Sequence, residues 1–256
     1  MDTQQHKSWN VLLVGDSCLD IYHYGVCKRM SPEAPVPVFK EFRQETKFGM
    51  SANVRLNLES FGIHVVHQHN KEIIEKHRFI ENNYNQQLFR YDRGEAVQSS
   101  PMVPRVFNDF DAVVVSDYDK GFITPASFNL LREQLDPRTP IFVDSKKKDL
   151  RIFGDCILKI NDTEALTAIT DSTQEVVVTL GARGALWKGQ TYKTDKVDVF
   201  DVCGAGDVFL ASLVYGYLSH KDLSHAITIA NKCASLSVTK MGTYVLTKED
   251  INDLCI

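Results

Sequence analysis

The segment Asp201–Asp207 combines residues that could hold an anion with a residue that could accept a proton. It reads Asp-Val-Cys-Gly-Ala-Gly-Asp, and an apolar run of helical character follows it directly. Two glycines and an alanine leave main-chain amides bare where a helix should begin, and such amides attract anions with help from the helix dipole. An anion bound there would repel the carboxylate of Asp207. The presence of that carboxylate therefore suggests a base that faces a phosphate and a hydroxyl together. The segment therefore indicates phosphoryl transfer, although an ordinary loop at a helix start also favours Gly and Asp.

Two better-known nucleotide-binding patterns are not present in the chain. Gly204 and Gly206 begin a G-x-G-x-x-G, but position 209 is Phe, so the dinucleotide fingerprint fails. No G-x-x-x-x-G-K-[ST] pattern occurs either. A phosphate site here would therefore belong to neither of those two types.

Short apolar runs, several of them ending in a polar residue or a glycine, predict a parallel sheet that would position this segment. The runs are Val11–Val14, Ala112–Val115, Ile141–Val143, Ile157–Ile160 and Glu175–Thr179. Helical patterns cover Ser51–Ser60, Pro125–Leu135, Asp207–Leu218 and Ser224–Thr239, and Thr247 begins a last helix. Because ligands of open α/β sheets bind beyond the carboxyl ends of the strands, we expect the polar residues there to share one crevice.

One region breaks the alternation of strands and helices. Ala34–Phe42 is extended and punctuated by prolines, which belong on edge strands, and Glu81–Tyr91 also has strand character. We expect these segments to form a small additional sheet that acts as a lid.

Composition narrows the class of protein. The 256 residues suffice for one large α/β domain or two small ones, and the net charge of −4 argues against nucleic-acid or anionic-membrane partners. No apolar stretch could span a bilayer, and residues 1–10 carry no signal-peptide core. The six cysteines include no C-x-x-C pair, so we expect reduced thiols in a cytoplasmic protein.

Several motifs resemble one known family. Asp201–Asp207 matches the D-x-x-G-A-G-D signature of the ribokinase-like (PfkB) carbohydrate kinases, and Gly49–Val54 stands where the family has its amino-terminal signature. The string Arg29–Val38, with its S-P-E-A-P-V-P-V, is similar to the kinase domain of the bacterial D-glycero-β-D-manno-heptose-7-phosphate kinases. Asn85–Asp92 and Ser116–Gly121 are similar to the same subfamily.

The resemblance implies a fold and an activity. The fold is a three-layer α/β/α ribokinase-like fold with a mostly parallel central sheet and a small β-sheet lid. It would be one kinase domain over residues 1–256, with lid elements at about 24–44 and 79–92. The activity is ATP- and Mg²⁺-dependent phosphorylation of the anomeric hydroxyl of a heptose 7-phosphate or a similar sugar phosphate. The family also suggests a homodimer formed through the lid.

The resemblance assigns roles to residues of the phosphate site. Asp207 matches the catalytic base, and Gly204, Ala205 and Gly206 match the anion hole. Asn161 and Glu164 match an N-x-x-E motif that positions hydrated Mg²⁺ through water, although the same spacing also suits a helix cap.

It also assigns binding residues around that site. The expected nucleotide-binding residues are Thr179, Gly181, Gly184, Asn231 and Gly242, and Lys146 could reach a nucleotide phosphate or lie in a solvated loop. The expected substrate residues are Gly49, Asp20 and Asn53, the last two at sugar hydroxyls, with Arg90 and Lys120 as candidates for a sugar phosphate or for ordinary surface charge.

The chain departs from the subfamily in ways that keep alternatives open. Met50 stands where a second glycine is usual, Cys203 replaces a threonine, and the chain is shorter after Gly62 and after Ala165. A kinase of another small sugar or nucleoside, or a non-catalytic relative that binds a sugar phosphate or nucleotide, would fit these changes. The spacing His64-x-x-His67-x-His69 invites a metal site, but no cysteine or carboxylate with ligand spacing accompanies it.

Overall fold

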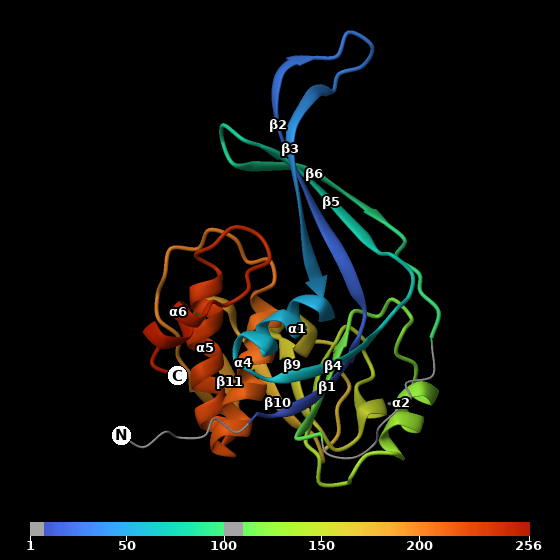
Figure 1. The fold of residues 1–256 in the computed structure, drawn as a ribbon, viewed down its shortest axis with the longest axis vertical. Coiled ribbons are helices and arrows are strands. Elements are labelled where there is room, and N and C mark those ends of the chain that lie inside the picture. The colour runs from blue at the N-terminus through green and yellow to red at the C-terminus, as the bar shows by residue number, and fades with distance from the viewer. Residues whose placement is uncertain (1–7, 100–109) are drawn as a thin grey trace.

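The structure of the chain, a computed structural model, describes residues 8–99 and 110–256 (Figure 1). Residues 1–7, most of the polar amino-terminal stretch considered above, lie outside the described part. Within that part the larger sheet has eight strands in the order β12-β11-β10-β9-β8-β7-β1-β4. The strands are β1 (Asn10–Gly15), β4 (His64–His69), β7 (Ala112–Asp117), β8 (Ile141–Ser145), β9 (Ile157–Asn161), β10 (Glu175–Thr179), β11 (Ala185–Trp187) and β12 (Gln190–Tyr192).

Six strands of this sheet, from β4 to β10, are parallel, and β11 with β12 forms an antiparallel hairpin at one edge. The central strands β1 and β7 are apolar throughout their middle because helices cover both of their faces. Parallel strands end at the same edge of a sheet, so the polar residues that follow β1, β7, β8, β9 and β10 come together at that edge.

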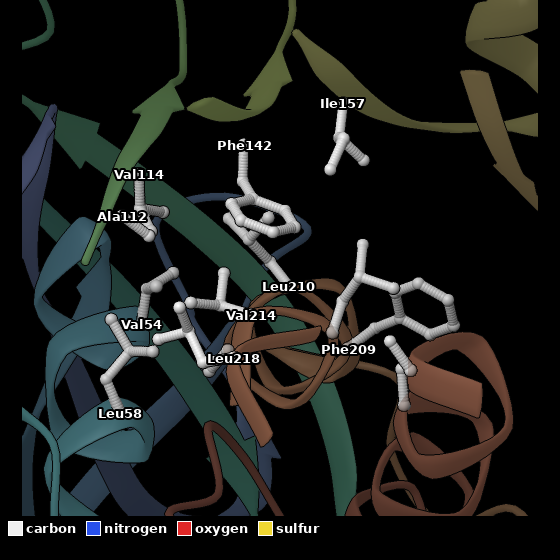
Figure 2. Packing of buried hydrophobic residues seen from close by; sticks show 14 of the residues in the cluster. Val54, Leu58, Ala112, Val114, Phe142, Ile157, Phe209, Leu210, Val214 and Leu218 are labelled. Atoms are coloured by element: carbon white, nitrogen blue, oxygen red, sulfur yellow. The ribbon is translucent and has the colours of Figure 1, made fainter. Parts of the chain in front are cut away.

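Helices form the outer two layers. On one face of the sheet lie α1 (Ser51–Ser60), α4 (Ala205–His220) and α5 (Leu223–Ser237), and on the other lies α2 (Pro125–Arg132). Figure 2 shows the first interface, where Phe142 and Val114 from the sheet meet Leu210 and Val214 of α4. Two short helices, α3 (Asp162–Ala165) and α6 (Lys248–Asp253), complete the set. Because its interface is apolar and fully buried, α4 is held firmly under the edge where the strands end.

A second sheet of four strands extends from this body (Figure 1). Its strands are β2 (Ser17–Met30), β3 (Pro37–Met50), β5 (Glu75–Glu81) and β6 (Gln86–Arg93), in the order β3-β2-β5-β6. One face meets the body, since Thr243 N donates to the Tyr22 hydroxyl at 3.3 Å and Lys47 Nζ donates to Met241 O at 3.2 Å. We call this face, which also carries Asp20, the inner face of the lid sheet.

The predicted three-layer α/β/α architecture with an additional small sheet is confirmed. Helix α4 begins two residues earlier than predicted because Gly204 adopts a left-handed conformation and caps it. Helices α2 and α5 end before their predicted limits, at Arg132 and Ser237. The three-residue strands of the β11–β12 hairpin were not predicted, since strands so short show no periodicity.

The trimmed periphery expected from the chain length is visible in the connections. Only residues 61–63 join α1 to β4, and α3 is a single turn of four residues. None of the described helices is long and apolar enough to cross a lipid bilayer.

Candidate active site

The amino terminus of α4 presents main-chain amides to the edge where the strands end. Gly204 has φ of 77°, and a Cβ there would lie 2.8 Å from Asn53 Nδ2, so only glycine fits this turn. Ala205 N donates weakly to Val202 O at 3.3 Å, and Asp207 N donates to Gly204 O at 3.0 Å. Among the described residues, the amides of Gly204 and Gly206 have no hydrogen-bond acceptor. The predicted three-residue anion hole therefore offers two free amides.

Asp207 lies in the first turn of α4 and is almost fully buried. Its Oδ2 accepts a hydrogen bond from Asn53 Nδ2 at 3.0 Å, and its Oδ1 accepts one from the Tyr118 hydroxyl at 2.7 Å. Burial raises the pKa of the Asp207 carboxyl to about 6, although the hydrogen bonds from Asn53 and Tyr118 pull that pKa down. A carboxylate of this kind is ionised near neutral pH and is basic enough to take a proton from a hydroxyl.

The raised pKa of Asp207 predicts that the contribution of this residue to the free energy of unfolding falls as the pH rises. Between the unfolded pKa of 3.8 and the folded pKa of about 6, the folded state binds more protons, so the free energy of unfolding decreases with pH. The shift corresponds to roughly 3 kcal/mol. We expect the melting temperature of the Asp207→Asn variant, relative to wild type, to be higher at pH 8 than at pH 4. An identical difference at both pH values would show that Asp207 has an ordinary pKa.

A cleft of about 430 Å³ opens beside these amides. Of the predicted nucleotide-binding residues, Thr179, Gly181, Gly184 and Asn231 line it together with Ala205 and Gly206. The rest of its wall includes the apolar side chains of Val197, Val199, Phe209 and Val238. An apolar slot that ends at free amides suits a flat ring joined to phosphates.

Three predicted nucleotide residues shape this region in distinct ways. A Cβ at Gly184 would lie 2.0 Å from Tyr192 O, so glycine is required for the close approach of β12. Asn231 Nδ2 donates to the same Tyr192 oxygen at 2.8 Å and so holds the cleft wall. Gly242 is not among the cleft-lining residues, because its amide donates to Asp201 Oδ2 at 2.9 Å in the neighbouring loop.

Asn161 and Glu164 form a reciprocal capping box at the start of α3. Asn161 Oδ1 accepts from Glu164 N at 2.7 Å, and Glu164 Oε2 accepts from Asn161 N at 2.8 Å. Glu164 Oε1 also pairs with Lys146 Nζ, which lies 3.5 Å from Asp144 Oδ1. The helix-cap alternative is thus realised, and the carboxylate is still partly exposed where it could accept hydrogen bonds from water.

A buried ion pair that was not predicted lies beneath Gly206. Lys159 Nζ is 2.6 Å from Asp144 Oδ2, and both side chains are more than nine-tenths buried. A Cβ at Gly206 would lie 2.9 Å from Lys159 Nζ, so the missing side chain lets the ammonium approach the helix terminus. A lysine inside the apolar run Ile157–Ile160 was the available signal, because unpaired charge is rare in a buried strand.

The lid sheet carries two of the predicted sugar-binding residues, Asp20 and Gly49. Asp20 Oδ1 accepts from Arg78 Nε at 3.2 Å and from Arg78 Nη2 at 3.1 Å. A Cβ at Gly49 would lie 2.1 Å from Asp20 Oδ2, which explains the glycine. Asn53, on α1, contacts Asp207 directly. Asp20 and Asn53 are both buried.

The two predicted phosphate-binding cations already have partners. Arg90 pairs with Asp92, its neighbour on β6, and Lys120 Nζ lies 2.6 Å from Glu95 Oε1. Lys76 instead has no hydrogen bond or ion pair to any described residue, although it is nine-tenths buried. It faces Asp20 across β2 and β5, and its ammonium lies 5.4 Å from the centre of the Tyr118 ring.

Tyr118 and Lys76 are therefore functional candidates that the sequence analysis missed. Tyr118 belongs to the Ser116–Gly121 string, but nothing local indicates that its hydroxyl reaches Asp207. Lys76 lies at the start of a strand with mixed polarity, where a lysine is usually exposed. Both contacts depend on elements that are far apart in the sequence.

The histidine series on β4 does not form a metal site. His67 Nε2 lies 2.9 Å from Ser51 Oγ, and the His67 and His69 rings are 4.6 Å apart. Among the described residues, no group of three or more histidine, cysteine or acidic side chains could hold a metal ion. Burial lowers the pKa of His67 to about 3, so that ring stays neutral and serves as a packing residue.

Met50 occupies a conformation that favours glycine. Its φ of 56° and ψ of −135° lie in a region that costs a side chain on the order of 1–3 kcal/mol. The side chain is buried against Cys18 and Ile74, which compensates for the strain. Met50 therefore joins β3 to α1 through a backbone conformation that a glycine would adopt without strain.

Comparison with known proteins agrees with this geometry. The family model described as pfkB family carbohydrate kinase matches residues 145–250, which contain the α4 terminus, Asp207 and the cleft. This part of the chain is similar to that family. It is 29% identical to the bifunctional protein HldE of Nitratiruptor sp. over 95% of this chain and 64% of that protein. It is 28% identical to the bifunctional protein HldE of Hydrogenovibrio crunogenus over 99% of this chain and 64% of that protein. The chain thus spans less than two thirds of the length of these relatives.

Solved structures of ribokinases share the fold. Ribokinase from Thermotoga maritima superposes with a TM-score of 0.72 at 15% identity, covering 96% of this chain and 99% of that chain. Arabidopsis thaliana ribokinase, solved in complex with ribose and ATP, superposes with a TM-score of 0.68 at 14% identity over 96% of this chain and 98% of that chain. The fold class predicted from the sequence, ribokinase-like, is therefore confirmed.

Proposed function

We propose that this chain is an ATP-dependent carbohydrate kinase whose acceptor is a phosphorylated sugar, with the anomeric hydroxyl of a heptose 7-phosphate as the best candidate. The observation that carries the proposal is Asp207. It is a buried carboxylate with a raised pKa in the first turn of α4, and it is hydrogen-bonded to Asn53 and Tyr118.

The cleft supports ATP as the donor. Its apolar wall suits an adenine ring, and its inner end at Ala205 and Gly206 leads to the free amides. The family relative from Arabidopsis was solved with ATP and ribose, and this chain shares its fold. We assign Thr179, Gly181 and Gly184 to the nucleotide side on the basis of their place in the cleft.

The residues of the chain would divide the work of phosphoryl transfer. Asp207 accepts the proton of the attacking hydroxyl, and Asn53 holds the carboxylate oriented through its amide. The amides of Gly204 and Gly206, with Lys159 beneath them, stabilise negative charge on the transferring group. The lid sheet lies over the acceptor and excludes water.

The family also implies Mg²⁺, and oxygen ligands are what that ion requires. Glu164 and Asn161 are available to hold a hydrated ion through water, because Mg²⁺ retains much of its hydration shell in phosphate sites. The ion would neutralise charge on the nucleotide phosphates.

The phosphate of the acceptor is best assigned to Lys76. Arg90 and Lys120 are occupied by Asp92 and Glu95, whereas the buried Lys76 ammonium forms no hydrogen bond or ion pair with any described residue and only faces the Tyr118 ring. A buried cation without a partner is costly unless a ligand supplies the missing charge. This feature favours an anionic acceptor over a neutral sugar or nucleoside.

The test is a nucleotide-consumption assay over a matched panel of neutral sugars, nucleosides and sugar phosphates, heptose 7-phosphate included. We expect turnover with a sugar phosphate and formation of a bisphosphate that retains the original phosphate group. Turnover only with a neutral acceptor would contradict the proposed acceptor class. Binding of ATP without phosphorylation of any acceptor would favour the non-catalytic relative.

The outer face of the lid sheet supports the homodimer suggested by the family. Phe48, Phe89 and Tyr91 alternate away from the inner face, and each is about half exposed, at 48%, 52% and 54%. An apolar sheet face of this kind is typical of an interaction surface. We expect Phe89→Glu to shift the protein from dimer to monomer in sedimentation velocity. A wild-type protein that sediments as a monomer at all concentrations would contradict the dimer.

A further inference from the structure

The hydroxyl of Tyr118 is hydrogen-bonded to the proposed base Asp207, as the hydroxyl of an acceptor would be. It donates to Asp207 Oδ1 at 2.7 Å, while Asn53 Nδ2 donates to Asp207 Oδ2 at 3.0 Å. Both oxygens of the proposed base are therefore engaged by the protein itself. Asn53 is an amide and can only orient the carboxylate, whereas Tyr118 presents an O–H group, as a sugar or a water molecule does.

The Tyr118 ring is held in place on two sides. Lys76 Nζ lies 5.4 Å from its centre and Lys146 Nζ lies 5.6 Å from it, within the range of cation–π attraction. The backbone of the residue is anchored as well, because Tyr118 N donates to the buried Asp16 Oδ2 at 2.7 Å. The contacts of the ring and of the backbone thus fix the Tyr118 hydroxyl at Asp207.

The two flanking lysines belong to the two halves of the proposed site. Lys76 lies on the inner face of the lid sheet, where the acceptor phosphate is assigned, and Lys146 lies beside Glu164 on the nucleotide side. An anion bound to either lysine would compete with the ring for the ammonium charge. Binding of both substrates therefore weakens the cation–π contacts that hold the Tyr118 ring. This happens at the step when an acceptor hydroxyl must replace the Tyr118 hydroxyl at Asp207.

We propose that Tyr118 is a placeholder for the acceptor hydroxyl, which keeps water off Asp207 and so suppresses ATP hydrolysis until an acceptor displaces it. This inference rests on the proposed kinase function. In the suppressed reaction, a water oxygen forms a bond to the γ-phosphorus, the bond from that phosphorus to the β,γ-bridging oxygen breaks, and ADP leaves. The proton of the water passes to Asp207, so the products are ADP and inorganic phosphate.

Tyr118 keeps its proton under working conditions. Burial and the neighbouring carboxylates of Asp207 and Asp144 hold the pKa of the phenol well above its usual range. The side chain is therefore a hydrogen-bond donor that blocks the base, and it cannot act as a base in its own right.

The test compares ATP hydrolysis without an acceptor in wild type, Tyr118→Phe and the double variant Tyr118→Phe/Asp207→Asn. We expect Tyr118→Phe to hydrolyse ATP about tenfold faster than wild type, since a hydrogen bond to a charged group no longer competes with water. The double variant should lose that gain, because the activated water needs the Asp207 carboxylate. Tyr244→Phe is the matched control, as it removes a hydroxyl that donates to Asp250 Oδ2 at 2.8 Å outside the site.

Melting curves and ADP affinity show whether each variant is folded and binds nucleotide. Unchanged or slower hydrolysis in a folded, nucleotide-binding Tyr118→Phe protein would overturn the placeholder role and leave Tyr118 as a structural residue. A faster hydrolysis that persists in the double variant would also overturn it. These assays contain no acceptor, so their outcome is separate from the acceptor panel that decides the proposed function.

Discussion

Replacing Asp207 by Asn is expected to lower kcat for sugar phosphorylation by about a thousandfold, because general-base catalysis contributes ~10²–10⁴ and the amide cannot accept the proton. The change keeps the volume of the side chain and its contact with Asn53, so nucleotide affinity should stay close to that of wild type. Initial rates and a separate ADP titration measure the two quantities. Turnover that survives the substitution would remove Asp207 from the role of base.

The pH profile of the wild type provides an independent check on Asp207. Its pKa of about 6 means that the carboxyl is protonated and inactive as a base below that value. The rate at saturating substrates should rise with pH through about 6 and then level off. The Asp207→Asn variant, with no carboxyl at this position, should lack that rise. If the wild-type rate instead rose near pH 4, the Asp207 carboxyl would titrate as an ordinary surface group.

Replacing Lys76 by Met is expected to lower kcat/KM for a sugar phosphate by about a hundredfold, since truncating one partner of a buried charge pair costs 2–5 kcal/mol. The effect should fall mainly on KM, because the ammonium is proposed to hold the acceptor in the ground state and in the transition state alike. The affinity for ATP should not change. The free energy of unfolding should be maintained or increased, because Met removes a nine-tenths buried charge that forms no hydrogen bond or ion pair with any described residue.

Lys120→Met is the matched control for Lys76→Met. It removes the same ammonium group from a residue predicted for the same task, but Lys120 is paired with Glu95 at 2.6 Å. We expect at most a small loss of kcat/KM from this control. Equal losses in the two variants, or a loss from Lys120→Met alone, would assign the acceptor phosphate elsewhere.

The strain at Met50 bears on the choice among acceptors. A methionine held at φ of 56° and packed on Cys18 and Ile74 joins the end of β3 to the start of α1, next to Gly49 and Asn53. It lies at the base of the lid sheet, beside the residues expected to hold sugar hydroxyls. This is where the acceptor specificity of the chain would differ from that of relatives with two glycines.

The elements of the fold and the glycine turn that opens α4 could be predicted from the sequence because their signals are local. A parallel strand buried on both faces must be apolar along its length, as β1 and β7 are, and a helix that opens on Gly204 must cross a turn that only glycine fits. The two contacts of the Glu164 carboxylate depend less on local sequence. Glu164 caps α3 through Oε2 and pairs with Lys146 through Oε1, since one carboxylate has two oxygens and can do both.

The contacts that surround Asp207 were decided only by the tertiary structure. Its partners Asn53 and Tyr118 are 154 and 89 positions away in the chain, on α1 and on the loop after β7. Strand order brings those elements to one edge, and no local pattern encodes that order. The same holds for Lys76, whose sequence resembles that of an exposed strand but whose pairing with β2 buries it over Tyr118. Residue type and spacing determine which chemistry a segment can perform, whereas burial and charge pairing belong to neighbours that only folding supplies.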